Sequence, residues 1–421
     1  MKKRVVITGL GVVAPNGVGI PAFTEAIKNG TSGIEHIQEL ENLNFSCQLG
    51  GIPTISEEKK LAYFTPLQLR NFNSSGILYG VIAGMDAIRD AGIEISETEP
   101  NWDLGIVFGS GTSGVDKFRE AIYKIDDKNV RRLGSTTVVQ TMASGISAYL
   151  GGMTGAANLV TTNSSACATG TEAVLMGYER IASGKATQML CGSTSDHGPY
   201  IWGGFDAMKV LTYKHNKTPK KASRPMSASA SGFVPGSGAG ALVLESLESA
   251  EKRGATIYAE ILGGHINSGG QRDGGSLTAP NSKAVQRCIK NAMIDAGIAA
   301  AEIDYINGHL TATSKDPDEI VNWSTALQRK GTGFPYINSL KGMVGHCLAA
   351  SGSIEVVSTI LQLHEGFVFP NVNCEELHPE IANFVASEKI PQQKISATIH
   401  TAIKASFGFG DVNACVIFRK N

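Results

Sequence analysis

The chain has 421 residues, enough for two or three domains or for one large duplicated unit. Its apolar content of 42% and charged content of 18% are ordinary for a globular protein, which excludes a disordered chain. A formal net charge of −1 gives no overall attraction to nucleic acid or to an anionic membrane.

The N-terminal segment predicts a buried strand and not a targeting signal. Basic residues precede an apolar run, as in a signal peptide, but glycines interrupt the run and Pro15 ends it. We therefore expect a short strand over Arg4–Thr8, followed by a glycine-rich loop. Gly9 and Gly11 also fit a dinucleotide-binding fingerprint, but residues 15–17 would break the helix that this fingerprint needs, so we expect a plain turn. No stretch approaches the roughly 18 consecutive apolar residues of a membrane span.

Further along the chain, short apolar runs alternate with amphipathic segments. Helical spacing is found over Leu78–Asp90, and strands are expected over Leu104–Gly109, Ala239–Leu244, Tyr305–Ile306 and Pro335–Asn338. This alternation is typical of an α/β protein with buried sheets covered by helices. The charged stretch Glu245–Gly254 is the best internal boundary, and it divides the chain into halves of residues 1–254 and 255–421.

Cys167 is the candidate nucleophile. An apolar strand over Ala157–Val160 leads to it, a helix carrying apolar residues follows, and a second strand is expected over Gln188–Cys191. The small residues Ala166, Ala168 and Gly170 would leave space for a substrate. Because Cys167 would lie just before the amino end of a helix, we expect a lowered thiol pKa; a shift of about 1.5 units corresponds to roughly 2 kcal/mol.

The cysteine pattern argues against other uses. The seven cysteines are an odd number, and no CxxC pair occurs. A disulfide framework and a structural zinc site are therefore poor interpretations, and a reducing cytoplasm is the better one. We interpret the cysteines other than Cys167 as small buried hydrophobic residues.

Four motifs in the chain resemble those of the β-ketoacyl synthases, in the same order. SSACATGTEA around Cys167 resembles the nucleophile motif TACATG, and Asn307–Thr313 (NGHLTAT) resembles NAHGTxT. Asn338–His346 (NSLKGMVGH) resembles the motif K-x-x-x-GH, and Ser406–Asn413 (SFGFGDVN) resembles SFGFGGTN. The resemblance extends over nearly the whole chain, and is strongest to the elongating synthases of bacterial type II systems.

This resemblance implies a fold, an activity and partners. The fold is a thiolase-like duplicated αβαβα five-layer sandwich. The activity is a decarboxylative condensation: an acyl chain moves from acyl carrier protein to a cysteine, and malonyl-acyl carrier protein extends it. Neither a metal nor an organic cofactor is expected. The chain is expected to form a homodimer, or a heterodimer with a non-catalytic chain-length partner.

The resemblance also assigns roles to the residues that match the motifs. Cys167 is the nucleophile, and His309 and His346 donate hydrogen bonds to the malonyl thioester oxygen. Lys341 forms an ion pair with Glu319. The backbone N–H groups of Cys167 and Phe409 form the oxyanion hole, and Phe409 also gates the acyl tunnel.

Supporting roles follow for a second group of residues. Thr311 and Thr313 are expected to bond the phosphopantetheine arm, and Phe205 and Phe407 to line the tunnel. Asp316 and Glu319 fit a capping box, with Asp316 as the N-cap residue. Lys209 is expected to dock the carrier protein, with four lysines close in sequence: Lys214, Lys217, Lys220 and Lys221.

Several positions depart from the family pattern. Leu310 stands where a glycine is usual, and residues 226–231 lack the charges of relatives. Asp411 also replaces a glycine, beside the proposed oxyanion hole, so we expect backbone N–H groups to bond its carboxylate. These departures favour a specialised synthase, for instance for a polyene. A thiolase is the alternative, but it would need a second catalytic cysteine near the C-terminus. A non-catalytic chain-length partner would lack Cys167.

Overall fold

The computed structural model describes residues 2–421, and most of its strands form one large mixed sheet. The strands of this sheet are β1 (Val5–Ala14), β2 (Gly17–Val18), β5 (Leu104–Ser110), β6 (Val160–Thr161), β7 (Gln188–Ser195), β8 (Gly238–Ser246), β9 (Ala259–Ser268), β10 (Tyr305–Asn307), β11 (Tyr336–Asn338), β14 (Thr401–Gly408) and β15 (Val412–Lys420). Two small sheets pair β3 (Ile34–His36) with β4 (Leu49–Gly51), and β12 (Phe367–Val368) with β13 (Ile395–Ser396).

The large sheet repeats one strand topology. From the edge inwards, one half has the order β6-β5-β7-β8-β1, and the other half has the order β11-β10-β14-β15-β9. In each half the first three strands are parallel, and the last two are antiparallel to their neighbours. The halves join where β1 pairs with β9, through residues 5–7 and 259–261. This repeat is what a duplicated fold requires.

Helices cover both faces of the sheet. The longer helices are α1 (Ile20–Lys28), α5 (Ser75–Asp90), α6 (Val115–Asp126), α8 (Gly145–Thr154), α9 (Thr169–Ala182), α10 (Pro199–Ala207), α12 (Ser282–Ala296), α13 (Asp316–Leu327) and α15 (Ser351–Glu365). The shorter helices are α2 (Gln38–Asn42), α3 (Glu57–Leu61), α4 (Pro66–Leu69), α7 (Thr137–Thr141), α11 (Leu247–Lys252), α14 (Lys341–Val344) and α16 (Pro379–Ala382).

Each half of the sheet lies between an inner and an outer layer of helices. In the middle, α9 and α15 contact each other and strands of both halves, and Val174 and Ile354 belong to their shared apolar core. On the outside, α5 and α8 cover the N-terminal strands, and α12 and α13 cover the C-terminal strands. Because helices bury both faces, strands such as β5 are continuous apolar runs with no polar alternation.

The first strand is longer than the sequence predicts. β1 runs through Gly9 and Gly11, and the loop expected after Thr8 is absent from this described segment. The reason is helix packing. A Cβ on Gly9 would lie 2.3 Å from the carbonyl oxygen of Ala87 on α5, and one on Gly11 would lie 1.9 Å from that of Ala83. The two glycines therefore let α5 lie directly on the strand. The dinucleotide interpretation is excluded, because these glycines lie within a strand and not before a helix.

Other predicted elements agree in type and differ in extent. α5 begins three residues before the predicted Leu78, and β7 continues to Ser195 beyond the predicted Cys191. The strand expected over 157–160 is reduced to the two residues of β6. The proposed boundary at 245–254 is not a linker, because β8 ends within it and α11 follows. The chain nevertheless passes here from one repeat of the sheet to the other.

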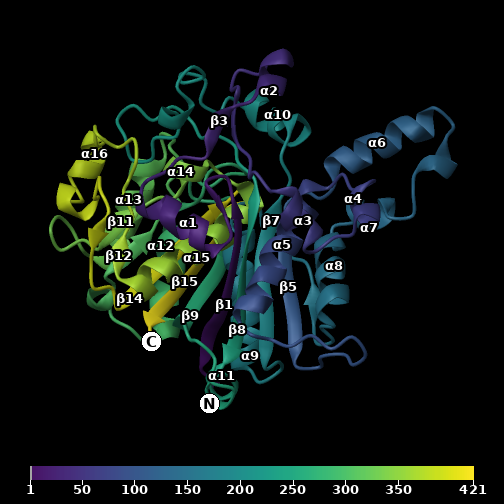
Figure 1. Cartoon of the computed structure of the whole chain (residues 1–421). Coiled ribbons are helices and arrows are strands. Elements are labelled where there is room, and N and C mark those ends of the chain that lie inside the picture. The colour runs from purple at the N-terminus through teal and green to yellow at the C-terminus, as the bar shows by residue number, and fades with distance from the viewer. Residues whose placement is uncertain (1) are drawn as a thin grey trace.

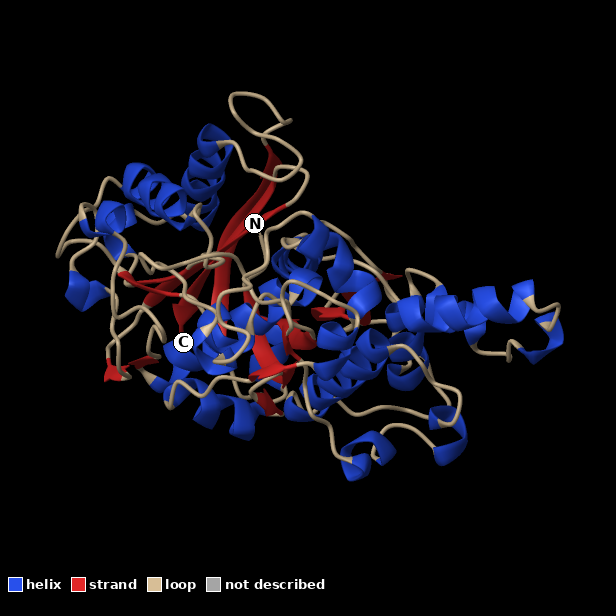
Figure 2. Ribbon diagram, turned by 90° about the horizontal axis from the view of Figure 1, so that it is seen from above, coloured by secondary structure: helices blue, strands red, loops and turns tan. Residues whose placement is uncertain are grey.

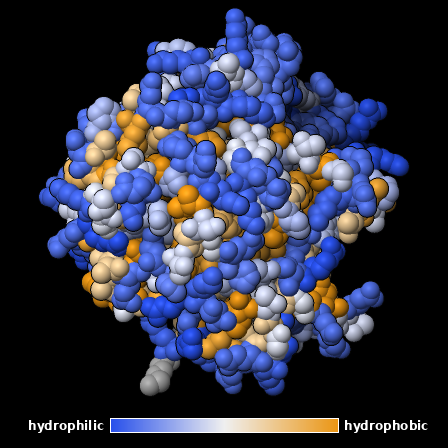
Figure 3. Space-filling model, turned by 60° about the vertical axis from the view of Figure 1, so that its left-hand side comes forward, coloured by the Kyte–Doolittle hydropathy of each residue, from blue (hydrophilic) through white to orange (hydrophobic). Residues whose placement is uncertain are grey.

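An arm projects from the N-terminal half (Figures 1 and 2). It contains α6, a short 3-10 turn at 130–132 and α7. The side of the molecule that lies to the left in Figure 1 is mostly hydrophilic, and its apolar residues lie in small groups (Figure 3).

Within residues 2–421, no helix combines the length and the apolar character that a membrane crossing requires.

Candidate active site

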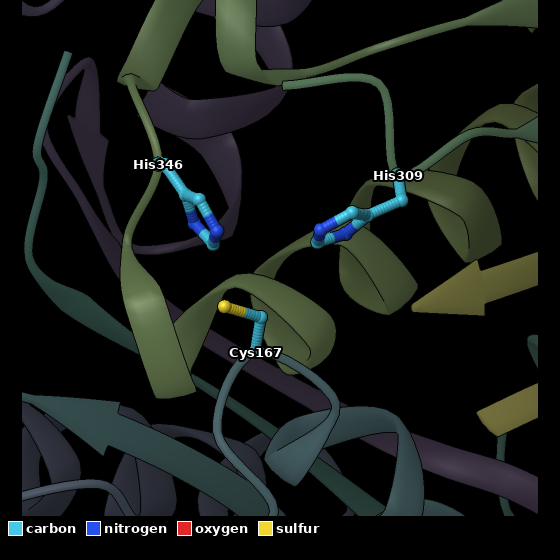
Figure 4. A group of neighbouring side chains, drawn as sticks. All are labelled: Cys167, His309 and His346. Carbon is cyan, nitrogen blue, oxygen red and sulfur yellow. The ribbon is translucent and has the colours of Figure 1, made fainter. Parts of the chain in front are cut away.

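Three of the predicted residues meet at one cavity. Cys167, His309 and His346 line a cavity of about 580 Å³. The Cys167 sulfur and one nitrogen of each imidazole lie within 4.8 Å of one another. Figure 4 shows both rings turned towards the thiol from separate segments of the chain. Two loops from one half of the fold and one from the other therefore bring together a nucleophile and two hydrogen-bonding rings.

A tight turn presents the thiol. Ala166 has a φ of 47°, a left-handed conformation that is strained for alanine and is often found at functional sites. The Thr169 hydroxyl holds this turn, because it accepts from the N–H of Ser165 (2.8 Å) and donates to the carbonyl of Ala166 (2.6 Å). α9 begins at Thr169, so the cysteine precedes the amino end of a helix, as predicted.

The small neighbours of Cys167 do not provide space for substrate. A Cβ on Gly170 would lie 2.3 Å from the Ser353 backbone nitrogen, so this glycine lets α9 pack against α15. Ala168 is buried in the core, and neither residue lines the cavity. The prediction about Ala166, Ala168 and Gly170 is therefore wrong: their small size serves the turn and the helix packing.

The predicted lowering of the thiol pKa is also wrong. Burial raises the pKa of Cys167 to about 11, although the Lys341 charge and the backbone N–H groups of Phe409 and Cys167 act to lower it. Loss of hydration disfavours the thiolate more than these groups favour it. The sulfur is partly accessible from the cavity yet surrounded by protein. The two N–H groups that act to lower this pKa are those predicted for the oxyanion hole.

The hydrogen bonds of His346 fix its tautomer. Its Nδ1 accepts from the Leu348 backbone N–H at 3.1 Å and lies 2.9 Å from the Ser351 hydroxyl. A nitrogen that accepts from an N–H carries no proton, so in the neutral ring the proton is on Nε2. Burial and the Lys341 charge lower the pKa of His346 well below 6.5. The ring is therefore a neutral donor.

The position of His309 is fixed by a hydrogen bond from its backbone N–H group. The Glu319 carboxylate accepts from the N–H groups of His309 (2.7 Å) and Leu310 (2.7 Å), which fixes the loop after β10. The Phe407 ring packs edge-on against the imidazole, with ring centroids 5.9 Å apart. Burial, followed by the Lys341 charge, lowers the pKa of His309 well below 6.5. This ring is neutral as well.

The predicted ion pair of Lys341 with Glu319 is wrong. The Lys341 ammonium pairs with Glu355 on α15 and donates to the carbonyl of His309 at 2.6 Å. Glu319 instead bonds backbone N–H groups and the Trp323 indole N–H, at 3.2 Å. Glu355 lies outside all four motifs, so the motifs gave no signal for it.

The predicted N-cap role of Asp316 is wrong too. Asp316 is the first residue of α13, and no side chain caps this helix. Its buried carboxylate accepts from the N–H groups of Thr311 (2.9 Å), Ala312 (3.2 Å) and Met226 (2.9 Å). Burial raises the pKa of the Asp316 carboxyl to about 7. Asp316 therefore holds the 311–313 loop against the segment that contains Met226. This supporting role differs from the predicted capping role.

The remaining predicted residues surround the cavity. Thr311 and Thr313 line it, and their hydroxyls lie 3.1 Å apart. Phe407 and Phe409 line it as well. Phe205 does not line the cavity, but its ring packs against Phe409, with centroids 6.1 Å apart. It therefore lies behind the predicted gate.

Lys209, the predicted docking residue, lines the cavity, and the four lysines close to it in sequence do not. It is exposed and follows α10. Lys220 is ion-paired with Glu35 and bonded to the carbonyl of Ser32. Lys209 is therefore the one of these five lysines that lies at the cavity.

Asp411 joins two loops at the cavity mouth. Its carboxylate is fully buried and accepts from the N–H groups of Gln271 (3.0 Å) and Asn281 (2.8 Å), which confirms the expected backbone bonding. Gly269 makes room for it, because a Cβ there would lie 2.1 Å from a carboxylate oxygen. Asp411 thus fastens the Phe409 loop to the 269–281 segment, part of which lines the cavity.

Comparison with known proteins agrees with this architecture. The family model for the β-ketoacyl synthase N-terminal domain matches residues 2–250, and the model for the C-terminal domain matches residues 258–375. A 3-oxoacyl-[acyl-carrier-protein] synthase 2 of Vibrio harveyi is 33% identical over 423 residues, covering 100% of this chain and 99% of that protein. The chain belongs to the β-ketoacyl synthase family.

Solved structures support the same conclusion. One contains a type II PKS acyl-carrier protein in complex with its ketosynthase bound to the hexaketide; it has a TM-score of 0.88 and 29% identity, with both chains fully covered. The ishigamide ketosynthase/chain length factor has a TM-score of 0.87 and 26% identity, also with full coverage of both chains. The predicted thiolase-like fold class is confirmed.

Proposed function

We propose that this chain condenses an acyl thioester with a malonyl thioester, both delivered on acyl carrier protein, to give a 3-oxoacyl thioester. The observation that carries the proposal is the cavity in which Cys167, His309 and His346 come within 4.8 Å of one another. Such a site needs no metal or organic cofactor, because loss of CO₂ supplies the carbanion. The thioesters arrive on the phosphopantetheine arm, for which Thr311 and Thr313 offer hydroxyl groups.

The first half-reaction moves the acyl group to Cys167. The cysteine sulfur attacks the acyl thioester carbonyl, the carrier thiol leaves, and the proton of the cysteine ends on the carrier thiol. The N–H groups of Cys167 and Phe409 stabilise the tetrahedral oxyanion. Since the pKa of Cys167 is raised to about 11, the free thiol is protonated at neutral pH, and deprotonation must accompany attack.

The second half-reaction forms the new carbon–carbon bond. The malonyl thioester loses CO₂, and negative charge develops on its thioester oxygen. The neutral imidazoles of His309 and His346 donate hydrogen bonds to that oxygen. The enolate carbon then attacks the acyl-cysteine carbonyl, the Cys167 thiolate leaves, and one proton from solvent restores the thiol.

A reconstituted reaction tests the proposal. The purified chain is mixed with malonyl carrier protein and a panel of acyl carrier proteins, and products are read by mass spectrometry. We expect products two carbons longer than the acyl substrate, together with CO₂. A thiolase, the alternative on the same fold, would act without malonyl decarboxylation, so elongation from acetyl thioesters alone would contradict the proposal.

Lys209 is the proposed docking residue for the acidic carrier protein, because it is an exposed lysine that lines the cavity; the other exposed lysine there, Lys315, is ion-paired with Asp318. We expect Lys209→Glu to raise the apparent KM for carrier-bound substrate by about 3- to 30-fold, while a small thioester substrate is unaffected. Steady-state kinetics with both substrates measures this difference. Lys252→Glu, on the exposed side of α11, is the matched control. Equal effects on both substrates would contradict a docking role.

Asp411 is proposed to restrict the acyl chain length. Asp411→Gly removes the acceptor of one buried and one partly buried N–H group, so we expect a loss of about 1–3 kcal/mol in stability and a looser Phe409 loop. The variant should accept a wider range of acyl lengths while retaining condensation. Thermal unfolding and the acyl-carrier panel measure the two effects. Asp127→Gly, at the exposed end of α6, is the control; if Asp411→Gly leaves both chain-length preference and rate unchanged, the argument for specialisation loses one of its supports.

The projecting arm supports a dimer. Its exposed apolar residues include Phe118, Tyr123 and Val138, which are 58%, 55% and 70% exposed. Nearby, β6 is the edge strand of the sheet, with free backbone groups that another chain can pair. A second copy of this chain is the proposed occupant. The native mass of the purified chain tests this, and a monomer that dimerises only with a chain-length partner would indicate the heterodimer.

The proposed compartment is the cytoplasm, and the proposed pathway is a specialised one. All seven cysteines lie in the described part of the chain and are free thiols, as a reducing compartment favours. Asp411, Leu310 and the uncharged 226–231 segment set this chain apart from the family pattern. A polyene or polyketide type of product is therefore proposed in preference to housekeeping fatty acids.

A further inference from the structure

A second lysine lies buried beside the site, outside the motif roles described above. Lys404 is in β14, three residues before Phe407, and its side chain has no exposed surface. Its ammonium lies 2.9 Å from a Glu355 carboxylate oxygen and 3.2 Å from the Ser406 hydroxyl. It also donates to the Ala405 carbonyl. A lysine is almost never fully buried without a partner, so this position calls for an explanation.

Lys404 and Lys341 share one carboxylate. Lys341 contacts one oxygen of Glu355 and Lys404 contacts the other, and all three side chains are at most 1% exposed. Lys341 alone would neutralise Glu355, so a protonated Lys404 adds a second positive charge to this pair; burial lowers the pKa of Lys404 from its ordinary value, and the Glu355 and Glu319 carboxylates act to raise it. Burying an uncompensated charge costs stability. A group that costs stability and lies beside a reaction site is a candidate for function.

The trio adjoins the reacting groups. Lys341 donates to the backbone of His309, and the charges of Lys341 and Glu355 both act on the Cys167 thiol. Lys404 acts electrostatically on both histidines. The titratable groups that face it from the surrounding elements are Lys341 on α14, Glu355 on α15, Glu319 on α13, Cys415 on β15, and His309 and His346.

We infer that Lys404 is a positioning residue whose ammonium, in contact with Glu355, offsets the field of that carboxylate at Cys167. This charge favours the thiolate and the oxyanions that form next to it. Without Lys404, Lys341 alone would balance the Glu355 carboxylate. The Cys167 thiolate and the oxyanions would then lose the stabilisation that the second cation provides. The inference rests on the proposed role of Cys167 as the acylated thiol.

The test measures the reactivity of the Cys167 thiol directly. Cys167 is alkylated with iodoacetamide across a range of pH, and its peptide is quantified by mass spectrometry. In Lys404→Met, we expect the rate at a fixed pH near 8 to fall about 3- to 10-fold, because a lost neighbouring cation raises a thiol pKa by roughly 0.5–1 unit. The melting temperature should stay level or rise, since the variant removes a buried charge. Lys404→Gln should shift the profile in the same way.

Lys117→Met is the matched control. Lys117 is also buried, at 2% exposed, but it lies on α6 and pairs with Glu120. Its alkylation profile should equal that of the wild type. An unchanged profile in either folded Lys404 variant overturns the inference. Failure of both variants to fold would show a purely structural role and overturns it as well. Alkylation needs no substrate, so this test does not depend on the condensation reaction. A failure of the proposed function is detected separately, as the absence of acyl-Cys167 when the wild type is incubated with an acyl-carrier thioester.

Discussion

Cys167→Ala is expected to abolish condensation. The thiol is the only sulfur that lines the described cavity, and the N–H groups of Cys167 and Phe409, which are proposed to hold the oxyanion, act to lower its pKa. Without the sulfur no acyl-enzyme forms, and the remaining groups can only catalyse loss of CO₂ from the malonyl thioester. Incubation with an acyl-carrier thioester, followed by peptide mass spectrometry, should find the acyl group on Cys167 alone.

Cys374→Ala is the control for this experiment. Cys374 is buried in the C-terminal core, and burial raises the pKa of its thiol to about 12. Its replacement should leave acylation of Cys167 intact. An acyl group found on Cys191 or Cys415 would instead show that the nucleophile has been misassigned. Both thiols lie in β-strands of the core, where a carrier-bound chain has no access.

The sequence predicted which residues meet at the cavity better than it predicted their supports. Cys167, His309 and His346 lie in short motifs, because a fixed turn or loop must present each side chain. Their supports come from elsewhere in the chain. Glu355 is a helix residue with no motif of its own, and it lies beside Lys341 only because α15 crosses the site. The motif resemblance favoured Glu319 for that pairing, and tertiary packing selected Glu355.

Burial was the other quantity that the sequence could not supply. The helix position of Cys167 predicted a lowered thiol pKa, and the surrounding protein reverses the direction of the shift. Likewise, Gly9 and Gly11 look like loop residues until the approach of α5 is known. Asp411 was interpreted correctly, because a carboxylate beside a developing negative charge has few acceptable environments, and backbone N–H groups are one of them.

His309→Ala and His346→Ala are expected to remove malonyl decarboxylation while some acyl transfer to Cys167 survives. Each imidazole is a neutral donor, and charge develops on the thioester oxygen mainly in the second half-reaction. Loss of one such donor typically costs about 10²–10³ in rate, on the order of 3 kcal/mol. Release of CO₂ and acylation of Cys167, measured separately, distinguish the two half-reactions. His400→Ala, an exposed position, should change neither.

The pH dependence gives an independent check on the histidines. Burial, followed by the Lys341 charge, lowers both histidine pKa values well below 6.5, so both rings stay neutral as the pH falls through 6.5. The decarboxylation rate should therefore show no acid limb near that pH, whereas an unperturbed histidine would produce one. A chelator should also leave the rate unchanged, because the rings act as hydrogen-bond donors and not as metal ligands. Normal decarboxylation in both alanine variants would refute the donor role.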